Sequence, residues 1–205
     1  MIIPNYLNRV FGDDKRFLIT VLVFHFILSL TLSHLRLMWF DELFTFHISQ
    51  LRPFQIFNSI ISPMDPSGLI HKYIVFLSHL INGPTKFGTR LPSVFFFSIT
   101  IITVYFICKR LKNINSANIA SILLLISIGQ YYSVEARTYS LILMLTSFLI
   151  ILIFKTPSKN INNYLLIIAI IVLLIFSHIY TIFLPLSILI SIIINYYLDN
   201  KIDLK

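Results

Sequence analysis

The chain has 205 residues, of which 57% are hydrophobic and 12% are charged, and its formal net charge is +8. A soluble core of this size cannot bury so much apolar surface, and a disordered chain would be polar, so both classes are excluded. The positive charge then indicates loops beside anionic lipid and no nucleic-acid partner. The apolar runs are continuous and lack the alternation of barrel strands, which predicts an all-α polytopic membrane bundle, with residues 1–205 as a single membrane domain.

The first apolar segments are long enough for single membrane spans, which need about 20 residues each. One runs from Phe17 to Leu37, and the lack of a small-residue cleavage site favours a retained helix over a signal peptide. The next runs from Leu91 to Cys108 and ends at a basic run. Cys108 is the only cysteine, so no intramolecular disulfide is expected.

Two longer apolar segments are each expected to form a helical hairpin. As single helices, Ala117–Phe154 and Tyr164–Tyr197 would be about 57 and 51 Å long, compared with about 30 Å of hydrocarbon. We place the first turn at Tyr131–Thr138, which contains the charged side chains of its segment, and the second near Ser177–Tyr180. Together with the two earlier spans, this gives about six transmembrane helices.

Lysine and arginine predict which side of the membrane each loop occupies. Of the 16 basic residues, ten fall on the side that carries both termini, mostly in short segments, and six fall on the other side. The positive-inside rule therefore makes both termini cytoplasmic and the loop of residues 38–90 external. We expect a multi-pass protein of the cell membrane, such as a bacterial inner membrane.

The long outer loop carries helical patterns of its own. An apolar stripe with helical spacing consists of Leu69, Ile70, Tyr73, Ile74, Leu77, Leu80 and Ile81. The opposite side is polar and consists of His71, Lys72, Ser78 and His79. This predicts an amphipathic helix in the interface plane, and a shorter one is indicated by Phe54, Phe57, Ile60 and Ile61. The alternative, an extra transmembrane pair, is disfavoured by the polar side.

Unusual polar side chains converge on the predicted outer face. Asp41 and Glu42 follow the first span, Glu135 and Arg137 occupy the turn of one hairpin, and His178 occupies the turn of the other. Ionisable groups at membrane depth are costly and indicate function by default. The alternatives are acids solvated at the interface, a structural Glu135–Arg137 ion pair and a buried histidine bonded to a carbonyl.

These groups favour transfer from a lipid phosphate to a hydroxyl group. An arginine fork binds phosphate well, a carboxylate can take a proton from a hydroxyl, and an interfacial helix can line a groove for a long lipid. Composition alone leaves a transporter or flippase open. A transporter is expected to carry ionisable groups near mid-membrane, and His25 is the only one clearly inside a span, which favours a site on one face.

Four motifs occur in order along the chain. They are W-F-D-E at Trp39–Glu42, G-P-T-K-F-G-T-R-L-P-S at Gly83–Ser93, Y-S-V-E-A-R-T-Y-S-L at Tyr132–Leu141 and F-S-H-I-Y-T-I-F at Phe176–Phe183. Together they resemble the N-terminal part of the GT-C membrane glycosyltransferases, in the branch of the protein O-mannosyltransferases and aminoarabinose transferases. Their order and spacing agree over Phe17–Leu198.

The resemblance implies an inverting glycosyl transfer at the outer face of the membrane. The donor would be a polyprenyl-phosphate-linked sugar, and the acceptor hydroxyl would displace the lipid phosphate directly from the sugar C1. Asp41 and Glu42 would form the catalytic acidic motif, with Asp41 as the general base and Glu42 orienting the site or pairing with an arginine. The alternative is a non-catalytic carrier-binding, flippase-like or small transport protein.

The resemblance also implies a site for the carrier phosphate. Arg137 is the first candidate and Arg90 the second, with Glu135 and His178 nearby. No cofactor is implied with certainty, a divalent metal beside His178 is left open, and the sequence shows no Cys/His metal spacing. Members of this family are generally longer, and their loop has a proline pair where this chain has only Pro66. We therefore expect a truncated chain, a minimal relative or half of a split enzyme, and in the last case a partner chain would supply the missing helices.

Overall fold

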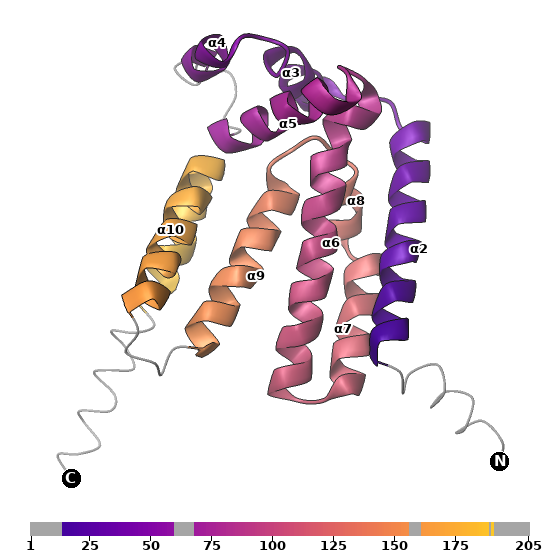
Figure 1. Ribbon diagram of the computed structural model, residues 1–205, viewed down its shortest axis with the longest axis vertical. Coiled ribbons are helices and arrows are strands. Elements are labelled where there is room, and N and C mark those ends of the chain that lie inside the picture. Colours follow the sequence, from indigo (N-terminus) through magenta and orange to yellow (C-terminus); the bar gives the residue numbers. More distant parts are fainter. Residues whose placement is uncertain (1–13, 60–67, 156–160, 189, 191–205) are drawn as a thin grey trace.

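The computed structural model describes residues 14–59, 68–155, 161–188 and 190 of the chain. These residues form helices joined by short turns, and no strand occurs among them. Upright helices stand side by side, and shorter helices lie across one end of them (Figure 1). The predicted all-α class is confirmed.

Two of the described helices are long and apolar enough to cross a membrane. They are α2 (Asp14–Leu35) and α6 (Lys86–Leu111), with 22 and 26 residues, and they contain most of the two single spans predicted first. The two helices pack together through a buried apolar cluster of Phe17, Val21, Phe97 and Ile101.

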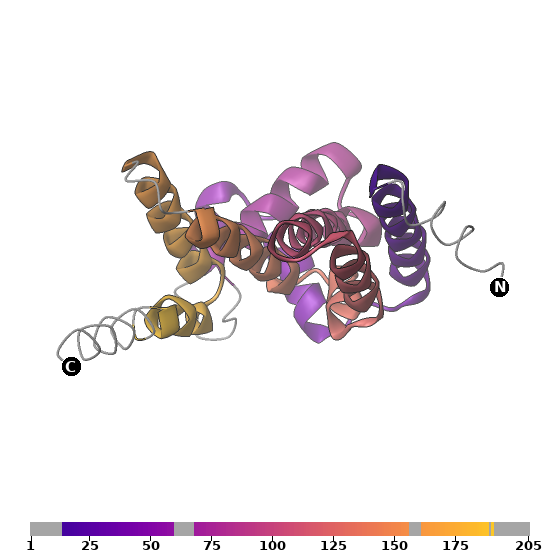
Figure 2. The ribbon, with the colours of Figure 1, turned by 90° about the horizontal axis from the view of Figure 1, so that it is seen from below.

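Three shorter apolar helices complete the upright row. α7 (Ile114–Ile126), α9 (Tyr139–Lys155) and α10 (Ile161–Ser177) have 13, 17 and 17 residues. Seen from below, α2 and α10 lie at opposite ends of the row (Figure 2). The contact between α9 and α10 is made by a second cluster of Leu141, Leu145, Leu149 and Leu174. Because these helices are shorter than the usual span of about 20 residues, the larger number of spans stays a prediction.

The first predicted hairpin is interrupted at two places. Its turn follows the short helix α8 (Ile128–Ser133) and lies within the predicted stretch. A second interruption, which sequence analysis missed, separates α7 from α8 at Ser127, whose hydroxyl accepts a hydrogen bond from the N–H of Gly129 at 3.1 Å. A side chain at Gly129 would place its Cβ 2.7 Å from the ring of Phe97, so only glycine allows this close approach.

The second predicted hairpin turns where the sequence placed it. α10 ends at Ser177, the 3₁₀ helix η2 covers Ile179–Ile182, and residues 183–188 are helical again. His178 precedes η2 and caps it, since its Nδ1 accepts a hydrogen bond from the N–H of Tyr180 at 3.3 Å. Residues 191–197 of the last predicted span lie outside the described residues, as does Pro66.

Helices α3 (Phe40–Ile48), α4 (Pro53–Asn58) and α5 (Leu69–Asn82) form a cap that lies across the ends of the upright helices (Figure 1). The predicted amphipathic helix is α5, and its polar side faces the protein: His71, Lys72, Ser78 and His79 are buried, whereas Leu77, Leu80 and Ile81 are exposed. The start of α6 supplies partners, because Ser78 donates to the Gly88 carbonyl at 2.6 Å and His79 Nε2 lies 2.9 Å from Thr89 Oγ1. The predicted shorter helix corresponds to α4, and Ile60 and Ile61 lie outside the described residues.

Candidate active site

Three ion pairs among the described residues gather where the cap meets the upright helices. They are Arg90–Glu42, Arg36–Glu135 and Arg137–Asp41. The participating side chains come from the end of α2, the start of α3, the start of α6 and the turn between α8 and α9. The structure thus brings the acidic motif of Asp41 to the turn of Arg137, as their predicted convergence requires.

The Arg90 guanidinium is fully buried and uses all of its donors within the protein. Its Nε and Nη2 donate to the two carboxylate oxygens of Glu42 at 2.8 and 2.6 Å. Its Nη1 donates to the carbonyls of Ser33 and Arg36 at 2.8 and 3.0 Å, and Nη2 also donates to the carbonyl of Leu37 at 3.0 Å. Those carbonyls lie at the end of α2, where intrahelical partners run out. Since every N–H donor is engaged, none is available for a phosphate in this arrangement.

The Glu42 carboxylate joins two parts of the site. Besides Arg90, it accepts a hydrogen bond from the backbone N–H of Ala136 at 2.9 Å, and it is fully buried. Ala136 directly precedes Arg137, just as Glu42 directly follows Asp41. Each of these contacts therefore helps to hold the Asp41 and Arg137 side chains beside each other.

The Arg137–Asp41 pair is the one of the three in which both side chains are partly exposed. Arg137 Nη1 lies 2.6 Å from Asp41 Oδ2, and the two side chains are 18% and 44% exposed. The guanidinium of Arg137 also lies over the ring of Tyr139, 5.0 Å from its centroid. A cation and a carboxylate that both reach the surface can both contact a bound molecule, which a buried pair cannot do.

Glu135 pairs with Arg36 and not with Arg137, so the structural pair considered from sequence is wrong. Arg36 Nη2 donates to Glu135 Oε1 at 3.0 Å, and its guanidinium lies 3.9 Å from the ring centroid of Tyr131. Among the described contacts, Glu135 and Arg137 are joined only through the backbone, where the N–H of Arg137 donates to the carbonyl of Glu135 at 2.8 Å. Sequence analysis missed Arg36 because a basic residue at the end of a span is common and carries no signal of its own.

A groove extends from Arg137 between α9 and the segment that follows α10. Its volume is about 520 Å³, and its lining residues are Arg137, Tyr139, Ile142, Thr146, His178, Tyr180, Thr181 and Leu184. Arg137 and His178, which lie far apart in the sequence, therefore line the same groove. The mixture of aliphatic and aromatic walls with a cation suits a lipid whose headgroup is negatively charged.

The described residues do not provide a metal site. No group of three or more His, Cys, Asp or Glu side chains among them could hold a metal ion. Glu42 is committed to Arg90, and the Nδ1 of His178 is engaged in capping η2. The divalent metal left open beside His178 therefore stays a prediction.

Comparison with known proteins identifies the family. A family profile described as dolichyl-phosphate-mannose-protein mannosyltransferase matches residues 66–203, which is more than half of the chain. The chain belongs to this family. No curated protein and no solved structure matches it.

Membership in the mannosyltransferase family confirms the resemblance inferred from the four motifs. The apolar helices and the family together make this a membrane protein. The matched range includes Arg90, Glu135, Arg137 and His178, whereas Asp41 and Glu42 precede it. The family thus covers the groove and the guanidinium at its end, and the carboxylates of α3 are placed beside them by the fold.

Proposed function

We propose that the chain is a membrane glycosyltransferase that moves a sugar from a polyprenyl-phosphate carrier to a hydroxyl acceptor. The observation that carries this proposal is the accessible Asp41–Arg137 contact at the end of a lipid-sized groove. Family membership supports a lipid-phosphate sugar as the donor. In the same proposal the chain has about six spans, both termini are cytoplasmic, and the cap lies on the outer face of the cell membrane.

Arg137 is the proposed ligand of the carrier phosphate. Its planar guanidinium can donate two parallel hydrogen bonds to phosphate oxygens, and its partial exposure leaves it accessible. The groove that it shares with His178 would hold the first part of the isoprenoid chain and the headgroup. His178 has a half-buried position there, which suits contact with the sugar or the phosphate.

Asp41 is the proposed general base, and the arriving phosphate would release it. In the structure Asp41 pairs with the guanidinium that the phosphate would take. Once the phosphate binds Arg137, the carboxylate is free to accept the proton of the acceptor hydroxyl. The hydroxyl oxygen then bonds to the sugar C1 from the opposite face, while the bond from C1 to the phosphate oxygen breaks. The electron pair of that bond leaves with the phosphate, whose charge Arg137 stabilises.

The other two pairs, each with a fully buried carboxylate, are assigned to positioning. Arg90 and Glu42 hold the end of α2, the start of α3 and the backbone of Ala136 together. The Arg36–Glu135 pair, with Arg36 stacked on Tyr131, holds the same turn from the side of α2. In both pairs the carboxylate is fully buried, so the pair fixes geometry and a ligand would have to break it to reach that carboxylate.

The test is transfer of labelled sugar from a polyprenyl-phosphate donor in membranes that contain the chain. Replacing Asp41 by Asn keeps the shape but removes the proton acceptor, so transfer should fall by about 10²- to 10⁴-fold. Asp41→Glu, which keeps a carboxylate, is the matched control and should retain more activity than Asp41→Asn. Full transfer by Asp41→Asn would contradict the assignment of the base. Carrier binding without transfer by the wild type would favour the non-catalytic carrier-binding alternative.

A further inference from the structure

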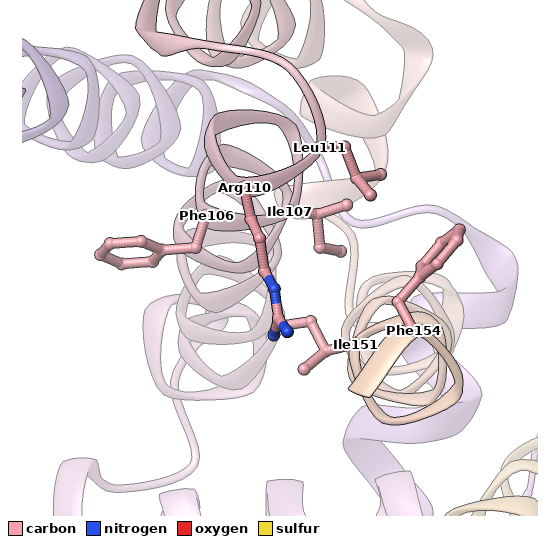
Figure 3. Close-up of a pocket in the computed structure, with 6 residues that line it drawn as sticks. All are labelled: Phe106, Ile107, Arg110, Leu111, Ile151 and Phe154. Atoms are coloured by element: carbon pink, nitrogen blue, oxygen red, sulfur yellow. The ribbon is translucent and has the colours of Figure 1, made fainter. Parts of the chain in front are cut away.

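A second crevice lies far from the candidate active site, at the end of the bundle opposite the cap. It lies between α6 and α9, has a volume of about 190 Å³, and is lined by Phe106, Ile107, Arg110, Leu111, Ile151 and Phe154 (Figure 3). Arg110 is the one charged side chain among these lining residues. Figure 3 shows its guanidinium extending across the crevice to lie beside Ile151. The crevice thus combines one cation with apolar walls.

Among the described residues, no acidic side chain is recorded as a partner of Arg110. Residues 91–134 and 136–198 contain neither Asp nor Glu, and Lys109 and Lys112 flank Arg110. Arg110 is also exposed, so its donors can reach a ligand. A negatively charged group would complement this end of α6.

The position along α6 indicates the depth of such a group. α6 is a candidate membrane span that ends at Leu111, directly after Arg110. The end of a span lies where the hydrocarbon meets the lipid headgroups. Phe106 and Ile107 lie one turn further into the span, where acyl chains begin. The order of cation and apolar walls therefore matches the order of phosphate and acyl chain in a phospholipid.

We propose that this crevice binds one anionic phospholipid, with its phosphate on Arg110 and an acyl chain against Ile107, Ile151 and Phe154. Anionic lipids are favoured over zwitterionic ones because Lys109 and Lys112 add to the positive potential around the site. The site is separate from the carrier groove at Arg137, from which it lies at the other end of α9. It does not depend on the proposed glycosyl transfer.

The experiment measures retention of phosphatidylglycerol by the full-length chain in phosphatidylcholine nanodiscs or mild detergent, by native mass spectrometry. Arg110→Gln removes the charge inside the crevice, and Ile151→Trp fills the crevice while keeping every charge. Lys112→Gln is the matched control, because it makes the same change of charge at an exposed residue that does not line the crevice. We expect Arg110→Gln and Ile151→Trp each to weaken phosphatidylglycerol binding about tenfold, and Lys112→Gln to change it less than about twofold.

Three outcomes would overturn the proposal. Equal losses in Arg110→Gln and Lys112→Gln would show attraction by the basic end of α6 as a whole and no built site. Unchanged retention in Ile151→Trp would show that the crevice takes no acyl chain. Equal retention of phosphatidylcholine and phosphatidylglycerol by the wild type would show no preference for anionic lipid. Since Ile151→Trp leaves Arg110 in place, it tests the crevice even if Arg110→Gln does not fold.

Discussion

At the scale of single residues, Asp41 differs from Glu42 in the accessibility of its carboxylate. Both oxygens of Glu42 are used inside the protein, whereas the Asp41 side chain is 44% exposed and its carboxylate pairs with Arg137. From the residues alone Asp41 and Glu42 are equivalent candidates, and only the family resemblance implied Asp41 as the base. The structure supplies a physical argument for the same choice, since a carboxylate can accept a proton only if a substrate can reach it.

The Asp41–Arg137 pair predicts that the base competes with the carrier phosphate. In Asp41→Asn, Arg137 loses its negatively charged partner, so affinity for polyprenyl phosphate should rise about two- to fivefold, as expected for a partly exposed ion pair. Asp41→Glu keeps the charge and should bind as the wild type does. The measurement is titration of purified protein with polyprenyl phosphate at low salt. Weaker binding by Asp41→Asn would rule out this competition.

Arg137 should also be sensitive to the shape of its cation. Arg137→Lys keeps the charge but loses the planar fork, and we expect carrier affinity to fall by roughly an order of magnitude, with a larger loss in Arg137→Ala. Arg52→Lys makes the same exchange at an exposed residue of the cap and should leave affinity unchanged. Both are measured by the same titration. Wild-type affinity in Arg137→Ala would remove Arg137 from the phosphate site.

At the scale of secondary-structure elements, buried polar contacts help to hold the cap to the bundle. Arg90 and Glu42 are both fully buried, and truncating one partner of such a pair typically costs about 3–5 kcal/mol. Glu42→Gln should therefore destabilise the junction of α2, α3 and α6, seen as faster hydrogen exchange in α3 and at the end of α2. The matched double variant Glu42→Gln with Arg90→Gln should lose less than the sum of the single losses. Strict additivity would show that the two residues act independently.

The buried side of α5 predicts a dependence of stability on pH. Burial lowers the pKa of His79 below its usual value of 6.5, so the unfolded chain binds this proton more readily than the folded chain does. The contribution of His79 should therefore be fully present above pH 6.5 and decrease as the pH falls below that value. Thermal unfolding in detergent, followed from about pH 8 to about pH 5, would measure this loss of stability, because histidine titrates within that range. The fall should be smaller in His79→Gln, and an equal fall in both proteins would exclude His79 as its source.

Elements and contacts differ in how far they could be predicted from the sequence. The helices α2, α6 and α5 follow from continuous apolar runs or from a regular apolar stripe, which are local patterns. The interruption at Ser127 is followed by Gly129, which approaches the ring of Phe97, a residue far away in the sequence. Likewise, the five acceptors around Arg90 come from the end of α2 and from Glu42, so Arg90 was read as a second phosphate ligand. Local patterns predict elements, whereas the partners of a polar side chain depend on tertiary structure.

At the scale of the whole molecule, the cap lies over one end of the upright helices, and the Arg110 crevice lies at their other end. If the row crosses the membrane as proposed, these ends face opposite aqueous compartments. Gln55 in the cap and Asn113 between α6 and α7 are both exposed and can report on this arrangement. A cysteine-free background, Cys108→Ser, allows a single new cysteine at either position to be labelled selectively.

The expected result is labelling of Gln55→Cys by an impermeant maleimide added outside intact cells. Asn113→Cys should be labelled only after the membrane is opened, because the basic residues around it favour the cytoplasmic side. The reverse pattern would invert the proposed topology. Labelling of both positions from outside would contradict a transmembrane row and leave the fold without its proposed orientation.

The Glu42 carboxylate, which binds Arg90 and the N–H of Ala136, has a consequence for the order in which the protein is made. A ribosome delivers the end of α2, then α3, then α6, and Ala136 only much later. Glu42 and Arg90 can therefore neutralise each other in the nascent chain before Arg137 has been synthesised. The carboxylate of Asp41 meets its guanidinium only after α7 and α8 have been synthesised. Synthesis itself thus delays the formation of a competent site until the surrounding helices are in place.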